Sequence, residues 1–456
     1  MSEVGTTSRP LRVAIIGAGP AGFYTAEHLQ KSEGITVAID MYDRLATPYG
    51  LVRLGVAPDH EKIKSVTKVY ERIAGRPGFR FFGCVEIGRD VTDADLADHY
   101  DAIVLTVGAP VDRRMGIPGE DLAGSHSATD FVAWYNAHPD HHDLTVDLGI
   151  QDVVVVGNGN VAVDVARILA TDAQELAHTD IADHALEILR TSAVRTVTML
   201  GRRGPAQAAF TPKEIRELGE LAGVTLVVDP VDLDAVGEVS GDEHAERVMK
   251  ALRAVAGRTP APGDRVIQLR FLTSPTELRG VDAVRAVVLV ENDLVERDGS
   301  LRAQPTDRTD VISAGLVLRA VGYRGAPVPG YPFDDRAGRI PNRDGRIIGD
   351  DGTPLVGRYV AGWIKRGPQG VIGTNKADAG DTVASIIDDL IEGRLLNPTH
   401  PTQDDASALV ATHAPGAISW DDWQQIDRRE RERGEPDGRP RRKFASLREM
   451  RDVLER

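Results

Sequence analysis

Residues 11–22, LRVAIIGAGPAG, join a continuous apolar run to a cluster of glycines. The apolar run at 11–17 predicts a buried strand, and the residues that follow at 21–31 predict a helix. A second apolar strand is expected at 35–43. A strand–turn–helix–strand unit of about 30 residues is the usual size of a parallel βαβ motif. The stretch therefore predicts an α/β fold with a parallel sheet.

The glycines of this unit have separate tasks. Gly17 permits the tight turn, Gly19 lets a pyrophosphate approach the backbone, and Gly22 lets helix and strand pack closely. Ala21 lies at the start of the helix, where free N–H groups and the helix dipole attract an anion. Asp43 ends the second strand, where a carboxylate accepts hydrogen bonds from an adenosine ribose. Because motif, context and acid agree, nucleotide binding is preferred to a glycine-rich turn in an ordinary α/β protein.

The same pattern recurs at residues 157–162, GNGNVA. A strand is expected at 152–157, a helix from about Val161, and a second strand at 194–200. Ala162 stands at the third small position, an accepted variant of the motif. Two units of one architecture within one chain predict two nucleotide-binding domains.

The second unit ends differently from the first, because its second strand is followed by Arg202 and Arg203. Two guanidinium groups there would attract a ribose 2′-phosphate, whereas an acid would repel it. The alternative is a solvated arginine pair on a surface turn. An acid in one unit and arginines in the other indicate FAD and NADPH, so that two electrons enter as hydride and pass to a flavin.

Two predicted strands, at 100–108 and 317–322, both end on Val-Gly. We interpret them as the crossings out of the first domain and back into it. This interpretation predicts a first domain formed by 1–108 and 323–456 and a second domain formed by 109–322.

Composition excludes several classes of protein. The chain has 456 residues and a net charge of −15, which argues against nucleic-acid binding through its overall field. Its only cysteine, Cys84, excludes an intrachain disulfide, an iron–sulfur cluster and a redox-active cysteine pair. We therefore expect no metal centre, a reducing and hence cytoplasmic location, and no membrane span. Residues 427–443 are rich in charge, proline and glycine and are expected to form an exposed segment or tail.

Five longer strings carry a more specific signal: TPYGLVRLGVAPDH (47–60), RFFGCVEIG (80–88), VVGNGNVAVDVARIL (155–169), GRRGPAQAAFTPKEIREL (201–218) and VAGWIKRGPQGVIGTNK (360–376). Through them the chain resembles adrenodoxin reductase and its actinobacterial ferredoxin/NADP reductase relatives along nearly its whole length. The resemblance implies two Rossmann-like dinucleotide-binding domains, with the NADPH domain inserted into a discontinuous FAD domain. It also implies hydride transfer from NADPH to FAD, followed by single-electron transfers to a small iron–sulfur ferredoxin.

The resemblance also assigns residues. It places FAD against Ala21, Asp43, Leu51, Val85, Trp363 and the backbone of Gly370, Val371 and Ile372. It places NADPH against Asn158, Gly159, Asn160, Val161, Arg202, Arg203 and Glu214, with Gly370 also near the nicotinamide. For Trp363 the alternative is packing in the core.

His60 ends the first of the five strings, and the resemblance pairs it with a carboxylate that matches Glu217. Glu214 and Glu217 are three residues apart and share one face of a helix. Because hydride transfer needs no acid or base, His60 and Glu217 are expected to tune position and potential. The alternative for His60 is a loop histidine with a satisfied hydrogen bond.

Docking of an acidic ferredoxin would need local positive charge on this acidic protein. Two groups qualify: Lys62, Lys64 and Lys68 after the His60 string, and Arg247, Lys250 and Arg253 on a predicted helix. The alternative for each group is a solvated charged face.

Other functions stay open. A protein with FAD and NADPH could act as an NADPH diaphorase or quinone reductase, as an FAD monooxygenase, or as an NADPH-sensing flavoprotein without turnover. An electron-transfer subunit like that of glutamate synthase is disfavoured, because such subunits carry iron–sulfur ligands.

Overall fold

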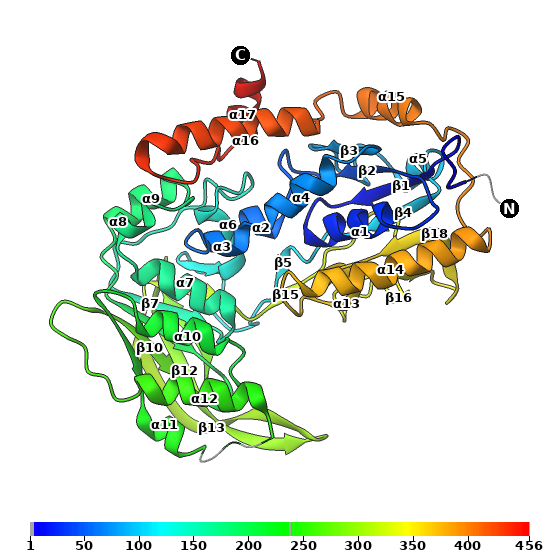
Figure 1. Ribbon diagram of the computed structural model, residues 1–456. Helices are drawn as coiled ribbons and strands as arrows, with labels where there is room; N and C mark the ends of the chain where they lie inside the picture. Colours follow the sequence, from blue (N-terminus) through cyan, green and yellow to red (C-terminus); the bar gives the residue numbers. More distant parts are fainter. Residues whose placement is uncertain (1–3, 237–238, 240, 456) are drawn as a thin grey trace.

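The computed structural model describes residues 4–236, 239 and 241–455. Two parallel-stranded sheets form its centre (Figure 1). The first has the order β16-β17-β18-β4-β1-β2-β3. Its strands are β1 (Leu11–Ile16), β2 (Val37–Tyr42), β3 (Phe79–Phe82), β4 (Ala102–Leu105), β16 (Asn342–Arg343), β17 (Arg346–Ile348) and β18 (Pro354–Val360). The pairs β16–β17 and β17–β18 at one edge are antiparallel, and the other pairs of this sheet are parallel.

The second sheet has the order β6-β14-β7-β8-β10-β9 and pairs in parallel throughout. Its strands are β6 (Ser125–Ser127), β7 (Asp152–Val156), β8 (Thr196–Leu200), β9 (Val224–Val228), β10 (Arg265–Arg270) and β14 (Leu316–Arg319). A three-stranded antiparallel sheet is inserted between β10 and β14 along the chain and projects at the bottom of Figure 1. It consists of β11 (Thr273–Gly280), β12 (Val284–Arg297) and β13 (Ser300–Ser313).

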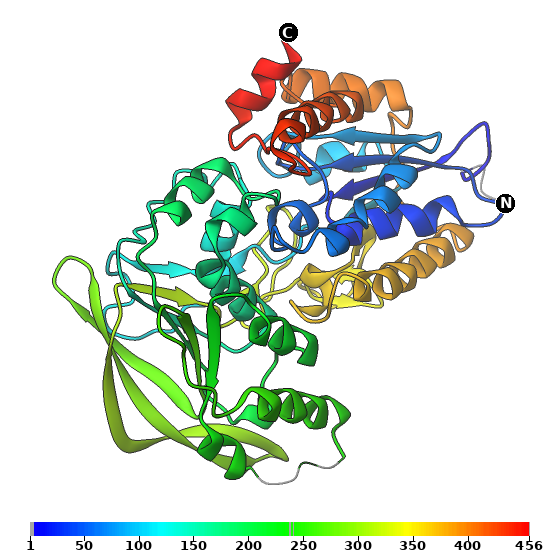
Figure 2. The same cartoon turned by 60° about the vertical axis from the view of Figure 1, so that its left-hand side comes forward.

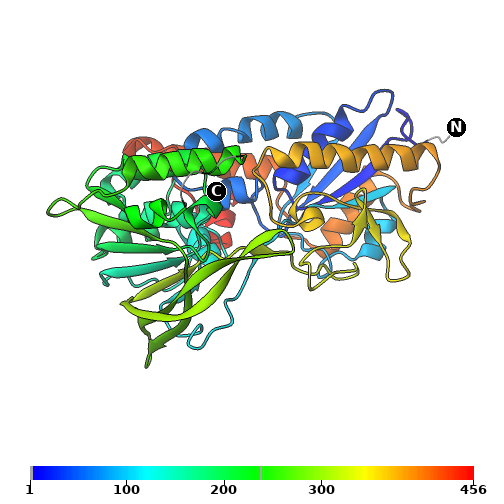
Figure 3. The same cartoon turned by 90° about the horizontal axis from the view of Figure 1, so that it is seen from below.

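Helices cover both parallel sheets. Those on the first sheet are α1 (Pro20–Gln30), α2 (Leu51–Leu54), α3 (Glu61–Lys64), α4 (Thr67–Ala74), α5 (Asp93–Ala97), α13 (Trp363–Arg366), α14 (Thr374–Ile391), α15 (Gln403–His413), α16 (Trp420–Gly434), the 3-10 turn η2 (Glu435–Asp437) and α17 (Leu447–Leu454). Those on the second are α6 (Ala128–Tyr135), α7 (Asn160–Ala170), α8 (Ala173–Leu176), α9 (Asp183–Arg190), η1 (Pro205–Gln207), α10 (Pro212–Gly219), α11 (Pro230–Asp234) and α12 (Glu243–Val255). We call each sheet with its helices the first and the second unit; Figure 3 shows them side by side, with α14 (gold) in one and α12 (green) in the other.

The predicted α/β fold with two Rossmann-like units is confirmed. All six residues of β1 are buried, because α1 and α14 cover one face of the first sheet and apolar side chains cover the other. A strand buried on both faces has the continuous apolar sequence that identified it. The glycines that end the predicted strands lie outside the ladders, in the turns that follow.

The chain passes between the units twice. After β4 it forms β5 (Val111–Asp112), and after β14 it forms β15 (Tyr323–Arg324); these two short strands pair antiparallel. The backbone N–H of Arg113 adds a hydrogen bond of 3.0 Å to the carbonyl of Gly322. The crossings therefore lie where the Val-Gly endings suggested, while the domain limits at 108 and 322 stay a prediction.

The expectation of an exposed segment at 427–443 is correct for 428–432 and 435–438, apart from Glu430, but wrong for the buried residues between and after them. Residues 427–434 complete helix α16, which begins with a capping box between Ser419 and Asp422, and η2 and a loop follow. Glu430 and Lys443 are buried, and α16 passes over the first unit toward α9 of the second (Figures 1 and 2). Arg439 and Lys443 are paired inside the protein, whereas Arg428, Arg429 and Glu432 are exposed.

Among the described residues, no helix combines the length and the apolar character that a membrane span needs.

Candidate functional site

The first glycine loop has the geometry that a pyrophosphate requires. Gly17 has φ +110°, and a Cβ there would lie 2.6 Å from the carbonyl oxygen of Thr106. A Cβ on Gly22 would lie 2.2 Å from the carbonyl oxygen of Gly17, so both positions exclude a side chain. A Cβ on Gly19 would meet nothing within 4 Å. The open space at Gly19, at the N-terminus of α1, is where a phosphate can approach the backbone.

Asp43 has a role beyond the one predicted for it. Its carboxylate accepts hydrogen bonds from the N–H groups of Ala18, at 2.8 Å, and Leu45, at 2.9 Å. Burial raises the pKa of Asp43 despite these two bonds. The carboxylate thus ties the glycine loop to the end of β2, and its contact with a ribose stays a prediction.

The other residues assigned to FAD lie on segments that converge on this loop. A Cβ on Gly362, the residue before Trp363, would lie 2.6 Å from Cβ of Ala21. A Cβ on Gly50, the residue before Leu51, would lie 3.0 Å from Cα of Gly19. Leu51 is exposed, whereas Val85 is buried and donates its N–H to the carbonyl of Asp43 at 2.9 Å.

Trp363 begins α13 and is half-buried. Its ring centroid lies 5.8 Å from that of Tyr323, in the crossing strand β15. Its indole Nε1 is buried and has no hydrogen-bond partner among the described residues. A buried donor of this kind is costly unless a partner is supplied, so Trp363 fits a position beside a bound polar group better than plain core packing.

The backbone conformation of the turn at 370–372 requires a glycine. Gly370 has φ +81°, and a Cβ there would lie 2.6 Å from Oγ1 of Thr374. The N–H of Val371 donates to the hydroxyl of Thr374 at 3.2 Å, so this donor already has a partner within the protein. Val371 is exposed, and Ile372 packs against the core of the first unit.

The second glycine loop repeats the first. Gly157 has φ +140°, and a Cβ there would lie 2.4 Å from the carbonyl oxygen of Ala320. A Cβ on Gly159 would again meet nothing within 4 Å. Gly159 precedes α7, whose first residues are Asn160 and Val161. This loop therefore offers a second open anion site at a helix N-terminus.

Asn158 and Asn160 connect the second loop to helix α10. The carbonyl of Asn158 accepts hydrogen bonds from the N–H groups of residues 209 and 210, at 3.1 and 3.0 Å. Oδ1 of Asn160 accepts from the N–H of Thr211, the N-cap of α10, at 3.0 Å. Since α10 carries Glu214 and Glu217, the loop fixes the place of both carboxylates.

Arg202 and Arg203 form the turn after β8. The carbonyl of Arg202 accepts from Nδ2 of Asn292 at 3.0 Å, and that of Arg203 from the N–H of Leu272 at 3.1 Å. Arg202 is exposed and Arg203 half-buried. Neither guanidinium forms an ion pair with any described residue, so both are available to an anion.

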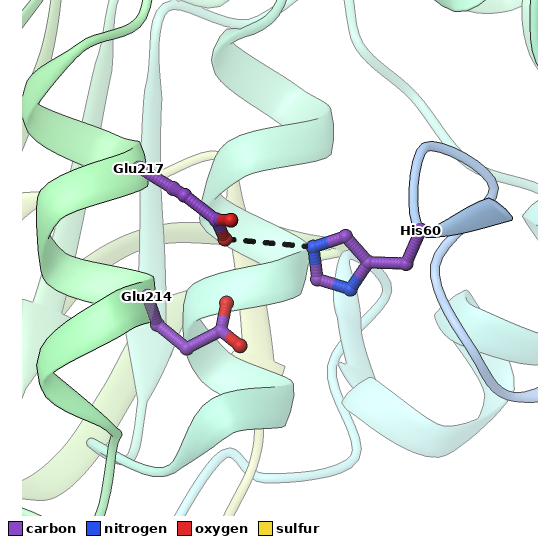
Figure 4. Close-up of side chains that lie close together, drawn as sticks. All are labelled: His60, Glu214 and Glu217. Atoms are coloured by element: carbon purple, nitrogen blue, oxygen red, sulfur yellow. Dashed lines mark ion pairs between the residues drawn. The ribbon is translucent and has the colours of Figure 1, made fainter. Parts of the chain in front are cut away.

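His60 meets the second unit at helix α10 (Figure 4). Its Nε2 lies 3.7 Å from Oε2 of Glu217, and its Nδ1 lies 3.9 Å from Oδ1 of Asp164. Ligand-type atoms of His60, Glu214 and Glu217 lie within 4.8 Å of one another. Such a set could coordinate a divalent cation, but both carboxylates already pair with cations of the protein: Glu214 with Arg167 at 3.5 Å, and Glu217 with Lys213 at 2.8 Å.

Arg167 is a residue that the sequence analysis missed. This buried side chain of α7 donates from Nε and Nη2 to Asp59, at 2.6 and 2.9 Å. It also reaches Asp164 at 2.8 Å. The arginine therefore joins the loop before His60 to the second unit. A signal was available, because Asp164 and Arg167 are polar residues three apart on an otherwise apolar helix.

Burial and charge set the protonation of this cluster. Burial lowers the pKa of His60, and the nearby Arg167 lowers it further, while Asp164, Asp59 and Glu217 oppose the shift only in part. Burial raises the pKa of Glu214. Burial alone would raise the pKa of Asp59, but its hydrogen bonds with Arg167 and the charges of Arg167 and His60 together outweigh burial and lower it. His60 is therefore a neutral imidazole at pH 7.

The two predicted docking groups have different environments. Lys62 and Lys68 are exposed, but Lys64 is largely buried, with Nζ 2.5 Å from Oδ1 of Asp180. Including Lys64 in a docking surface was wrong, because its ammonium group is paired with Asp180 inside the protein. Arg247, Lys250 and Arg253 all lie on the exposed face of α12, where Arg247 pairs with Glu243.

Known proteins resemble this chain over nearly its full length. A family model described as pyridine nucleotide-disulphide oxidoreductase matches residues 11–218. The NADPH-ferredoxin reductase FprA of Mycobacterium tuberculosis is 49% identical over 97% of this chain and 98% of its own length. The chain belongs to the family of the NADPH-ferredoxin reductases.

Further members of the NADPH-ferredoxin reductase family agree with this assignment. The mitochondrial NADPH:adrenodoxin oxidoreductase of Salvelinus fontinalis is 40% identical over 98% of this chain and 92% of its own length. A solved structure of FprA from Mycobacterium tuberculosis superposes with a TM-score of 0.92 at 48% identity, covering 98% of this chain and 99% of that one. That protein has also been solved in complex with NADPH. The predicted resemblance and the fold of the NADPH-ferredoxin reductases are thus confirmed.

Proposed function

We propose that the protein transfers electrons from NADPH, through bound FAD, to a small iron–sulfur ferredoxin. The observation that carries the proposal is the second glycine loop, which is open at Gly159, together with the guanidinium groups of Arg202 and Arg203 in the turn after β8, which form no ion pair with described residues. That combination suits a dinucleotide with a 2′-phosphate. The membership of the chain in the NADPH-ferredoxin reductase family supports the same function.

FAD would bind at the first glycine loop. Its pyrophosphate would lie at Gly19 and Ala21, and its ribose at the carboxylate of Asp43. Trp363 would lie beside the ring system, with its buried Nε1 available as a donor. Leu51 and Val85 would complete the pocket from the segments that lead to the loop.

NADPH would bind at the second loop, across the boundary between the units. Asn158, Gly159, Asn160 and Val161 would surround its pyrophosphate, and Arg202 and Arg203 would hold the 2′-phosphate, with Glu214 nearby. Gly370, together with Ile372, would border the place where nicotinamide and flavin face each other. The two reacting rings would thus be supplied by different units.

Bound FAD supplies an acceptor that takes two electrons as hydride and releases them one at a time. The chain has to hold the two rings in contact and to exclude water. His60 and Glu217 serve this purpose, because they lie on opposite units and approach to 3.7 Å. Since hydride transfer moves no separate proton and His60 is neutral, neither residue needs to act as an acid or a base.

An anaerobic titration tests the function. Purified protein is mixed with NADPH or NADH while the visible absorbance of the flavin is followed, and a ferredoxin coupled to cytochrome c is then added. Fast bleaching by NADPH and cytochrome reduction that depends on ferredoxin are expected. Bleaching with no dependence on ferredoxin would instead indicate a diaphorase, and trapping of reduced flavin by oxygen would indicate a monooxygenase. NADPH binding without bleaching would indicate a sensor, and absence of flavin would refute the proposal.

A further inference from the structure

The C-terminal segment places one lysine at the boundary between the units. The side chain of Lys443 is fully buried, with 0% exposure. Its Nζ donates to the carbonyl of Arg53 at 3.1 Å and to Oδ1 of Asn136 at 3.1 Å, and it lies 3.1 Å from Oδ2 of Asp180. An ammonium group has three donors, so each of them has a partner. Arg53 belongs to the first unit, whereas Asn136 and Asp180 belong to the second.

Asp180 also contacts helix α3. Its Oδ1 lies 2.5 Å from Nζ of Lys64, the last residue of that helix. His60 is the N-cap of the same helix. One helical turn, about 6 Å along the axis, separates the two residues, so the ion pair of Lys64 and the contacts of His60 lie at the two ends of one short element.

Neighbouring residues hold the segment on both sides. Nη1 of Arg439 pairs with Asp183 of the second unit at 2.6 Å, and Arg442 reaches the same carboxylate at 2.8 Å. On the first unit, Arg53 donates two hydrogen bonds to the buried carboxylate of Glu430, at 2.8 and 2.6 Å. Charge-assisted pairs with two parallel bonds fix direction as well as distance. Lys443 is thus presented from a segment that both units hold in place.

Apart from this segment, the units are in contact through the short crossing strands β5 and β15, through α3 and its preceding loop, and through the ion pair of Arg44 with Asp140. A reaction between rings bound to different units depends on their separation, and a misplacement of about 1 Å can cost about 100-fold in rate. The orientation of the units is therefore part of the catalytic geometry.

We propose that Lys443 is a positioning residue: through Asp180 and Lys64 it holds α3, and with it His60, at the distance from the second unit that hydride transfer requires. This inference rests on the proposed function. Lys443 would touch neither cofactor, since it acts through the orientation of the two units. Its loss should change the rate of hydride transfer more than the binding of either nucleotide.

Stopped-flow reduction of the full-length, FAD-loaded protein tests the inference. The variants are Lys443→Met, which keeps an unbranched chain but removes the ammonium group, and Asp180→Asn, which keeps the shape of the carboxylate. Arg448→Met is the matched control, because Arg448 is an exposed cation of the same C-terminal segment. The readouts are the limiting rate at saturating NADPH, the dissociation constant of NADPH, the FAD content, and photochemical reduction of the flavin, which needs no nucleotide.

Lys443→Met and Asp180→Asn should each lower the limiting rate at least about tenfold. The dissociation constant and FAD content should stay within about twofold of the parent, and photochemical reduction and the control variant should be unchanged. The double variant should be no slower than the worse single one, because both act on one contact. Parental rates in both variants would overturn the inference, as would loss of FAD, which indicates a general folding role. If Lys443→Met does not fold, Asp180→Asn decides alone. If the parent protein itself is not reduced by NADPH, the proposed function has failed instead.

Discussion

Arg167 holds Asp59 through two hydrogen bonds, of 2.6 Å from Nε and 2.9 Å from Nη2, although the two residues lie in different units. The arginine side chain is only 3% exposed, and it also pairs with Asp164 and Glu214. It therefore balances three carboxylates around His60. A buried charge of this kind is costly to remove, because its partners remain behind without compensation.

Arg167→Met should therefore destabilise the protein by about 2–4 kcal/mol, somewhat less than for a fully buried pair because Asp59 is partly exposed. The midpoint of urea unfolding, followed by flavin fluorescence, would measure the change. Arg216→Met is the control, since Arg216 is exposed on α10. Equal midpoints for the two variants would show that the Arg167 network contributes nothing to stability.

His60→Gln should slow flavin reduction by NADPH modestly, by less than the roughly 100-fold that is the lower limit for loss of a general acid or base. Glutamine can still approach Glu217 and cannot carry a positive charge. FAD should stay bound, which the absorbance spectrum of the purified variant would show. Complete loss of reduction with FAD retained would contradict a role in position and potential alone.

The rate of flavin reduction should vary little above pH 7, because burial and Arg167 lower the pKa of His60 below its ordinary value of 6.5. Asp164, Asp59 and Glu217 face the ring and oppose this shift only in part. The same shift makes folding stability depend on pH. Near and below pH 6.5, His60 in the unfolded chain binds a proton that His60 in the folded protein does not. The contribution of His60 to the free energy of unfolding is therefore complete above pH 6.5 and declines as the pH falls. Stopped-flow pH profiles of the parent and of His60→Gln would check this, because a pH-dependent change due to His60 must disappear in the variant.

The two glycine loops were predictable because their requirements are local. Gly17 and Gly157 need a positive φ and a close approach to a neighbouring strand, and the apolar strand and the helix that surround each lie within a short window of sequence. The arginine turn after β8 was predictable for the same reason. Such features depend on order along the chain, which the sequence gives directly.

The charged contacts between units were not predictable in this way. Nothing near Lys443 in sequence distinguishes it from the solvated charges of 427–443, since its partners Asn136 and Asp180 come from a distant part of the chain. The error over Lys64 has the same origin. The character of a charge, buried or solvated, is decided by tertiary packing, which composition and spacing do not record.

Arg202→Ala and Arg203→Ala, made separately, should each weaken NADPH binding by about 10–100-fold. A hydrogen bond to a charged group is worth about 1.5–3 kcal/mol. Binding of NADH should change little, since it lacks the 2′-phosphate. Titrations of both nucleotides would give the two ratios. If both nucleotides weaken equally, the arginines serve the pyrophosphate or the fold, and the basis for a preference for NADPH is lost.

Lys250→Glu should weaken the action of ferredoxin without affecting the reaction with NADPH. The lysine is exposed on α12 beside Arg247, and a net charge of −15 leaves few positive surfaces for an acidic partner. Reversing one exposed charge should raise the apparent KM for ferredoxin about fivefold at low salt, a change of about 1 kcal/mol, and the difference should shrink as salt increases. Ferredoxin-dependent reduction of cytochrome c would measure this, and direct reduction of ferricyanide should stay at the parental rate. Arg336→Glu, which changes the same net charge at an exposed position of the first unit, is the control. An equal effect of the two variants would mean that only overall charge matters, and an effect of Lys62→Glu with none of Lys250→Glu would move the docking surface to the segment after His60.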